Sequence, residues 1–179
     1  PGVVAVLVAM VLLLITKVDV EHMLEEIEWS TLLFFTGLFI LVGVLEAKGV
    51  IEWIAHNVFL RIGDNPYIIV LVVLWVSGIA SGFLDNIPFT ITMIPVVRLM
   101  LEANPIPNNI LWWALSLGAC LGGNLTMIGA SANIVSVGMA KRFDQNISFL
   151  EFMKSSAVIS VITLLIASVY LTVFLWLSL

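Results

Sequence analysis

The sequence has few of the groups that most enzyme sites require. Its single cysteine, Cys120, excludes an intrachain disulfide and a cysteine metal cluster. It has only two histidines, and there is no His-Glu zinc pattern and no serine nucleophile with a matching base. Charged residues make up 11% of the chain, and the net charge of -5 comes mostly from one acidic connection, Asp19 to Glu28. This charge by itself decides nothing about nucleic acid, which would need a basic face. We expect no enzymatic activity, no cofactor and no nucleic-acid partner.

Apolar residues dominate the chain instead. Hydrophobic residues form 61% of the sequence, and the mean hydropathy is +1.17. Too little polar surface remains to cover a water-facing exterior. The composition predicts an all-α, multi-pass integral membrane protein whose main partner is the lipid bilayer, located in a plasma or inner membrane. The first residues, PGVVAVLVAM, begin inside an apolar run without an initiating Met or a basic leader, which is typical of a chain cut from a longer one.

Residues 1–62 are predicted to supply two scaffold spans and one interfacial helix. The spans are Val3 to Ile15 and Leu32 to Leu45, and the first is shorter than the roughly 20 residues that a perpendicular span needs. Between them, the acidic stretch from Asp19 to Glu28 has the pattern of an amphipathic surface helix or a tight loop. From Lys48 to Ile62, polar residues recur every four positions opposite apolar ones. This spacing predicts a helix that lies flat in the membrane interface.

The central feature of the sequence is GIASGFLDNIPFTIT, from Gly78 to Thr92, which places Asp85 and Asn86 between two apolar arms. Two full spans joined by a short turn fit this pattern, and so does a re-entrant hairpin over residues 63–103. We favour the hairpin, because a connection exposed to water would normally carry more than one charge. Irregular backbone at membrane depth survives only inside protein or beside a water-filled cavity. An ionisable residue there indicates a functional site.

A second interruption lies in the apolar run over residues 110–140. Its sequence, LGGNLTMIGASANIV, is predicted to break a transmembrane helix after Gly122 and Gly123. A broken helix exposes two opposed dipole ends at mid-depth, which suit a cation and an anion. After the break, a capping box of Ser148 and Glu151 is predicted to start the last helix, which spans the membrane over residues 155–179.

Structural roles compete with these functional ones. Asp85 or Asn86 can cap the helix that begins near Pro88, and the glycines after position 121 can form a packing kink. Three hydroxyl side chains are expected to hydrogen-bond to the backbone of their own helices: Thr90, Thr92 and Ser131. Two glycine pairs have the small-xxx-small spacing that permits close helix packing, namely Gly78 with Gly82 and Gly118 with Gly122.

Three sequence blocks carry a resemblance to a known family. They are WSTLLFFTGLFILVGVLEAKGVIEWIA, SGFLDNIPFTITMIPVV and LSLGACLGGNLTMIGASANIV. In this order and spacing, the chain resembles the C-terminal half of the ion transporter superfamily, in the group of arsenite permeases, NhaD-type sodium/proton antiporters and the melanosomal P protein. The resemblance implies an elevator-type secondary transporter with two inverted repeats, of which residues 1–179 form the second. It also implies an upstream N-terminal repeat of the same protein as partner, and a homodimer.

The resemblance places the substrate and ion site where the hairpin tip meets the broken helix. The binding residues it implies are Asp85, Asn86, Thr90, Asn124, Thr126, Ser131 and Asn133. The glycines it implies at the backbone breaks are Gly82, Gly122, Gly123 and Gly129. A sodium ion is expected near Asp85, Asn86 and Asn124, and the coupling ion is Na⁺ or H⁺.

One departure from the family pattern bears on the substrate. Related carboxylate carriers hold Ser-Asn-Thr at the tip, where this chain has Asp85-Asn86-Ile87. The difference argues for the antiporter or metalloid branch, with cation/proton exchange or with metalloid or anion export. A proton and a sodium ion can compete for the one acid, Asp85, which is the simplest route to exchange. A citrate-like or dicarboxylate-like organic-anion carrier and a non-transporting membrane scaffold remain as alternatives.

Overall fold

A computed structural model describes residues 2–16, 21, 25, 29–54, 57, 63–141 and 143–178. Within these ranges all regular elements are helices and no strand is present, as the all-α prediction requires. The chain divides into two compact units, Pro1–Gly37 and Leu38–Leu179.

The first unit contains α1 (Gly2–Thr16) and the opening turns of α3 (Trp29–Ala47). Both helices cover the apolar segments predicted as scaffold spans. α1 carries no charged residue, and its large apolar side chains are exposed along the helix. The predicted acidic surface segment lies outside the described residues, except for Glu21 and Glu25.

The second unit begins with the remaining turns of α3 and the short helix α4 (Val50–Ile54). Gly49, at a φ of 71° that favours glycine, separates the two helices. Ile51 of α4 is 1% exposed, and α4 packs against α6. A helix therefore forms at the start of the predicted interfacial segment. The rest of that segment, apart from Asn57, lies outside the described residues.

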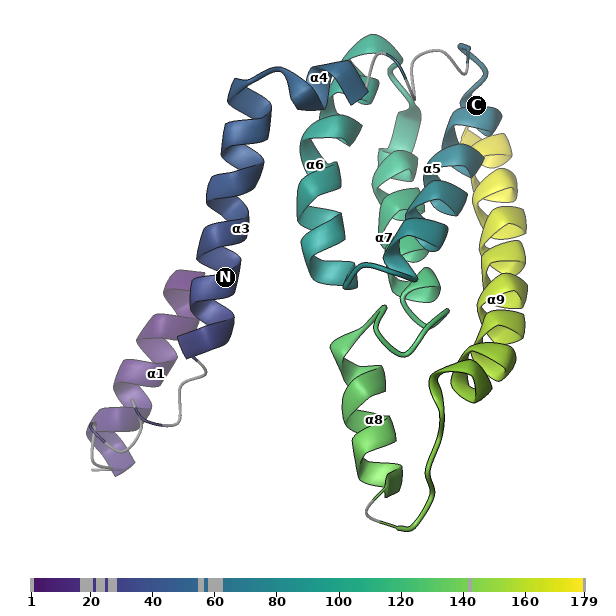
Figure 1. Ribbon diagram of the computed structural model, residues 1–179. Helices are drawn as coiled ribbons and strands as arrows, with labels where there is room; N and C mark the ends of the chain where they lie inside the picture. Colours follow the sequence, from purple (N-terminus) through teal and green to yellow (C-terminus); the bar gives the residue numbers. More distant parts are fainter. Residues whose placement is uncertain are drawn as a thin grey trace. The chain divides into compact units, whose positions relative to one another are not determined.

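Four helices form the main body of this unit (Figure 1). They are α5 (Pro66–Ser81), α6 (Asn86–Ala103), α7 (Ile110–Gly122) and α9 (Phe149–Ser178), with a 3-10 turn, η3 (Pro107–Asn109), before α7. α5 begins with an Asn65 cap that accepts a hydrogen bond from Tyr67 N at 3.0 Å and with Pro66 in its first turn. α9 begins with the predicted capping box, in which the Glu151 carboxylate accepts from Ser148 N at 2.9 Å.

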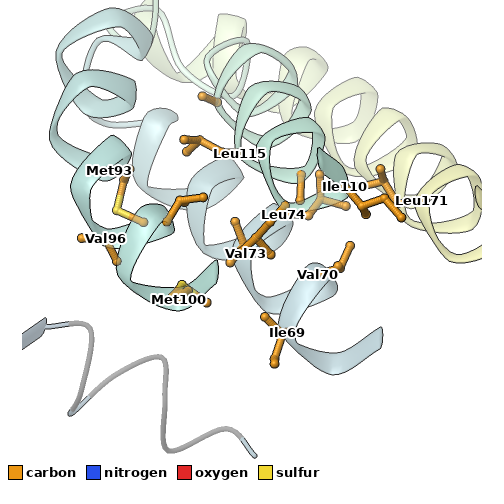
Figure 2. Close-up of a cluster of buried hydrophobic side chains, with 14 of the residues drawn as sticks. Ile69, Val70, Val73, Leu74, Met93, Val96, Met100, Ile110, Leu115 and Leu171 are labelled. Atoms are coloured by element: carbon orange, nitrogen blue, oxygen red, sulfur yellow. The ribbon is translucent and has the colours of Figure 1, made fainter. Parts of the chain in front are cut away.

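α5 and α7 lie at the centre of the packing, because they pack against each other and each also contacts α6 and α9. Figure 2 shows apolar side chains of these four helices meeting in one cluster. Fully buried members of this core include Val73, Leu74, Ile110 and Leu171. α7 and α9 are neighbours along this core, so one continuous apolar cluster holds α5, α6, α7 and α9 together.

Glycines bring α5 and α7 into backbone contact. A Cβ atom added at Gly118 would lie 2.5 Å from the Leu74 carbonyl oxygen, and one added at Gly122 would collide with the backbone of Gly78. These three positions, Gly78, Gly118 and Gly122, are called the glycine seam below. The seam confirms that the small-xxx-small spacing serves close helix packing.

The apolar exterior fits a membrane protein. Two helices, Asn86–Ala103 and Phe149–Ser178, are long and apolar enough to cross a bilayer. Exposed apolar side chains continue along α9, for example at Ile166, Val169 and Trp176. In water such a surface would be unfavourable, whereas acyl chains cover it without cost.

Candidate functional site: the hairpin tip and the helix break

The first part of the site is the turn from Gly82 to Asp85, which joins α5 to α6. Asp85 is the N-cap of α6, and one of its carboxylate oxygens accepts a hydrogen bond from Ile87 N at 3.1 Å. Both Asp85 and Asn86 are half-buried. The capping role expected for this acid is therefore confirmed, and capping occupies only one of its two carboxylate oxygens. The chain forms a helical hairpin here, while the depth of its tip in a membrane stays a prediction.

The second part of the site is the predicted break, where α7 ends at Gly122 and α8 (Ser131–Lys141) begins nine residues later. Asn133 stabilises the connecting loop, because its side-chain amide donates to the carbonyl oxygens of Gly123 and Thr126, each at 3.0 Å. The side-chain amide hydrogens of Asn133, a predicted binding residue, therefore bond to the backbone. The oxygen of the same amide group can still accept a hydrogen bond from a ligand or coordinate an ion.

The hairpin tip and the helix break meet directly. Thr126, which is 0% exposed, donates its hydroxyl hydrogen to the Gly82 carbonyl oxygen. A Cβ added at Gly129 would lie 2.8 Å from that same oxygen, and one added at Gly123 would lie 3.5 Å from Cβ of Asn86. The structure thus brings five predicted residues into one cluster, called the tip–break cluster below: Gly82, Asn86, Gly123, Thr126 and Gly129.

Ser81 is a buried polar residue beside the candidate site that sequence reasoning missed. It is fully buried and donates a hydrogen bond to the Ala119 carbonyl oxygen at 2.7 Å, so it joins the end of α5 to the end of α7. The available signal was a small polar residue directly before the interruption of an apolar arm, next to Gly82.

Other predicted residues lie outside this cluster or hydrogen-bond to the backbone of their own helices. The hydroxyls of Thr90 and Thr92 donate to the carbonyl oxygens of Asn86 and Pro88, at 2.7 and 3.0 Å, as expected. Ser131 is exposed in the first turn of α8.

Asn124 faces a cavity beside α9. It is exposed, donates to the Cys120 carbonyl oxygen at 3.4 Å, and lines this cavity together with residues of α9. Neither Asp85 nor Asn86 lines the same cavity. Among the described residues no group of three His, Cys, Asp or Glu side chains is placed to hold a metal ion. The sodium ion expected near Asp85, Asn86 and Asn124 stays a prediction.

Helices with exposed apolar faces, two of them long enough to span a bilayer, fit a membrane protein. The chain belongs to the citrate transporter family, whose sequence signature matches residues 1–118.

Named relatives agree with this assignment. The chain is 41% identical over 173 residues to an uncharacterized transporter of Mycobacterium tuberculosis, an alignment that covers 96% of this chain and 40% of the relative. It is 40% identical over 173 residues to a 46 kDa membrane protein of Mycobacterium leprae, with the same coverage. It is 41% identical over 181 aligned positions to the P protein of Homo sapiens, covering 96% of this chain and 22% of the relative.

The chain therefore spans two fifths or less of the length of these relatives. The resemblance to the ion transporter superfamily is confirmed. The mycobacterial relatives are named as transporters or as a membrane protein, which are not names of enzymes. No solved structure matches the chain.

Proposed function

We propose that this chain is one repeat of a secondary active transporter and that the tip–break cluster contributes half of its binding site. The observation that supports the proposal is the hydrogen bond from Thr126 to the Gly82 carbonyl oxygen, which joins two interruptions 44 residues apart in the sequence. The hairpin tip and the helix break, joined by this buried hydroxyl, form a polar region among apolar helices. A transported ion needs such a place to leave its hydration shell.

The chemistry at this place suits a small cation. α7 ends at the cluster, and the partial negative charge of a helix C-terminus lies there. Its last carbonyl groups already accept hydrogen bonds from Ser81 and from the backbone N–H groups of residues 123–125, so the ion would be held by side-chain oxygens. The carboxylate of Asp85 and the amide oxygen of Asn86 are hard oxygen ligands of the kind that Na⁺ and other hard cations prefer. Because a carboxylate holds either a proton or a cation, we propose cation/proton exchange at Asp85.

The moving element of this transporter would be the block formed by α5, α6 and α7. The glycine seam and the Ser81 hydrogen bond hold α5 against α7, and the Thr126 hydrogen bond joins the turns that follow these two helices. α6 packs against α7. A rigid block can carry a bound ion across a membrane without opening its own packing. The proposed partners are an upstream N-terminal repeat, which completes the site, and a second copy of the protein, in a plasma or inner membrane.

The experiment is a flux assay with the full-length protein in proteoliposomes, comparing wild type with Asp85→Asn. Asparagine keeps the helix cap, so the fold is retained while the ionisable group is lost. We expect proton-coupled cation flux to fall roughly tenfold or more, the effect of losing ~1.4 kcal/mol of ion binding. The matched control is Glu102→Gln, which neutralises an exposed acid of the same helix. Unaltered flux in Asp85→Asn would remove this acid from the mechanism.

An organic-anion carrier is the second candidate, and the family description favours it. The N-termini of α6 and α8 both lie next to the tip and the break, and a helix N-terminus suits an anion. The same proteoliposomes test this reading through uptake of labelled citrate. Saturable citrate exchange without cation/proton exchange would replace the antiporter proposal.

A further inference from the structure

A cavity of about 710 Å³ lies between the end of α7 and the first turns of α9. Its wall is polar near the start of α9, where Asn124, Gln145, Asn146 and Glu151 line it, together with several hydroxyl side chains. The segment around Gln145 and Asn146 is exposed and precedes the apolar part of α9. This end of the cavity therefore has the character of a membrane surface, where lipid headgroups lie.

The cavity continues into an apolar groove along the same two helices. This groove, of about 460 Å³, shares Leu121 and Thr163 with the cavity and extends to Trp113 and Tyr170. Thr163 and Tyr170 are seven residues apart on α9, a distance of ~10 Å at the rise of an α-helix. The cavity and the groove together, called the α7–α9 groove, are polar at one end and apolar along the membrane-spanning part. That is the shape of a lipid molecule.

The charges of the α7–α9 groove indicate which headgroup it fits. Glu151 is the one carboxylate among its described lining residues, and no Lys, Arg or His is among them. Anionic lipid headgroups are recognised by clusters of Lys and Arg. One carboxylate beside neutral amides and hydroxyls instead suits a zwitterion. The ammonium group donates to the carboxylate, and the phosphate oxygens accept from the amides and hydroxyls.

We propose that the α7–α9 groove binds one phospholipid with a primary ammonium headgroup, of the phosphatidylethanolamine class. The headgroup lies against Glu151, and an acyl chain lies along Leu121, Ala167 and Tyr170. This site is separate from the tip–break cluster, and the proposal does not depend on what the protein transports.

The test measures lipid retention by native mass spectrometry of the full-length protein in detergent, with phosphatidylethanolamine or phosphatidylglycerol added. We expect selective retention of one phosphatidylethanolamine per chain and a roughly tenfold loss of affinity in Glu151→Gln, equivalent to ~1.4 kcal/mol. Glutamine keeps the capping box of α9, so only the charge changes. The control Glu102→Gln should bind like wild type. Equal retention of the two lipids, or no effect of Glu151→Gln, would overturn the proposal.

Photo-crosslinking from position 113 provides a second readout that does not depend on charge. Trp113 lines the apolar part of the α7–α9 groove and is exposed. A photoreactive residue in its place should crosslink to phosphatidylethanolamine in the full-length protein. Crosslinking to another protein segment instead of lipid contradicts the proposal.

Discussion

Asp85 combines a structural and a chemical role in one side chain. One carboxylate oxygen holds the start of α6 through Ile87 N, and the other is available to a proton or an ion. An acid fixed in this way has a defined direction before a ligand arrives, so less side-chain entropy is lost on binding. The structural role of Asp85 as a helix cap therefore assists its proposed role as an ion ligand. The Asp85→Asn variant separates the two roles, because asparagine keeps the cap and removes the charge.

At the residue scale, the glycine seam makes a sharp prediction for Gly122→Ala. The new Cβ would collide with the backbone of Gly78, which cannot move aside like a flexible side chain. We expect the variant to lose about 1–3 kcal/mol of stability, as overpacking in tight cores does, and to unfold at a lower temperature in detergent.

The matched control for the seam is Gly138→Ala. Gly138 lies within α8, and an added Cβ there meets no atom within 4 Å. Alanine also favours a helix over glycine by roughly 0.5–1 kcal/mol. The control should therefore be as stable as wild type or more stable. Equal destabilisation of the two variants would show that glycine flexibility, rather than close packing, matters at Gly122.

At the scale of elements, the contact between the α5–α6 hairpin and the α7–α8 break depends on one hydroxyl. Thr126→Val keeps the size of the side chain but removes the donor to the Gly82 carbonyl oxygen. Leaving a buried carbonyl without a partner costs about 1–3 kcal/mol. We expect faster hydrogen exchange at residues 82–86 and 123–130, together with weaker coupled flux.

Thr172→Val is the comparison for this prediction. The Thr172 hydroxyl donates to the Ser168 carbonyl oxygen in its own helix, at 2.7 Å. Its loss should leave exchange at the hairpin tip unchanged. If Thr126→Val also leaves exchange at the tip unchanged, the tip and the break are held together by packing alone.

The elements could be predicted because their signals are local. The first apolar arm of the predicted hairpin is α5, from Pro66 to Ser81, and its start is encoded by the Asn65-Pro66 pair. The break after Gly122 was readable from two adjacent glycines in an apolar run. Helix caps, proline and glycine act through the backbone of their own neighbours, so a single sequence is enough to place them.

The direction of the polar side chains in the break could not be predicted. Asn124 and Asn133 look equivalent in sequence, yet Asn133 stabilises the loop while Asn124 lines the cavity beside α9. Residues 123–130 have no helical period, so their orientation depends on contacts with α5, α6 and α9 that lie far away in the chain. The same reason explains why the buried link through Ser81 was missed.

At the scale of the whole molecule, the exposed apolar surface gives a test of membrane insertion. Val169 of α9 is 65% exposed. In a water-soluble protein Val169→Asp would be harmless, whereas an aspartate near the centre of a membrane span costs about 2.5–3.5 kcal/mol of insertion free energy. We expect a glycosylation-mapping assay to show reduced insertion of α9. Leu150→Asp, at an exposed position near the start of the helix, should insert almost normally, and equal insertion of both variants would argue against a spanning α9.

The length of α9 has a consequence for the membrane itself. The helix contains 30 residues, or ~45 Å at 1.5 Å per residue, whereas the hydrocarbon core of a bilayer is only about 30 Å thick. α9 must therefore tilt, extend past the acyl region or locally thicken the surrounding bilayer, at a cost that grows with each ångström of mismatch. A thick membrane would hold α9 upright and a thin one would tilt it. Bilayer thickness would then act on the helix that packs directly against α5 and α7.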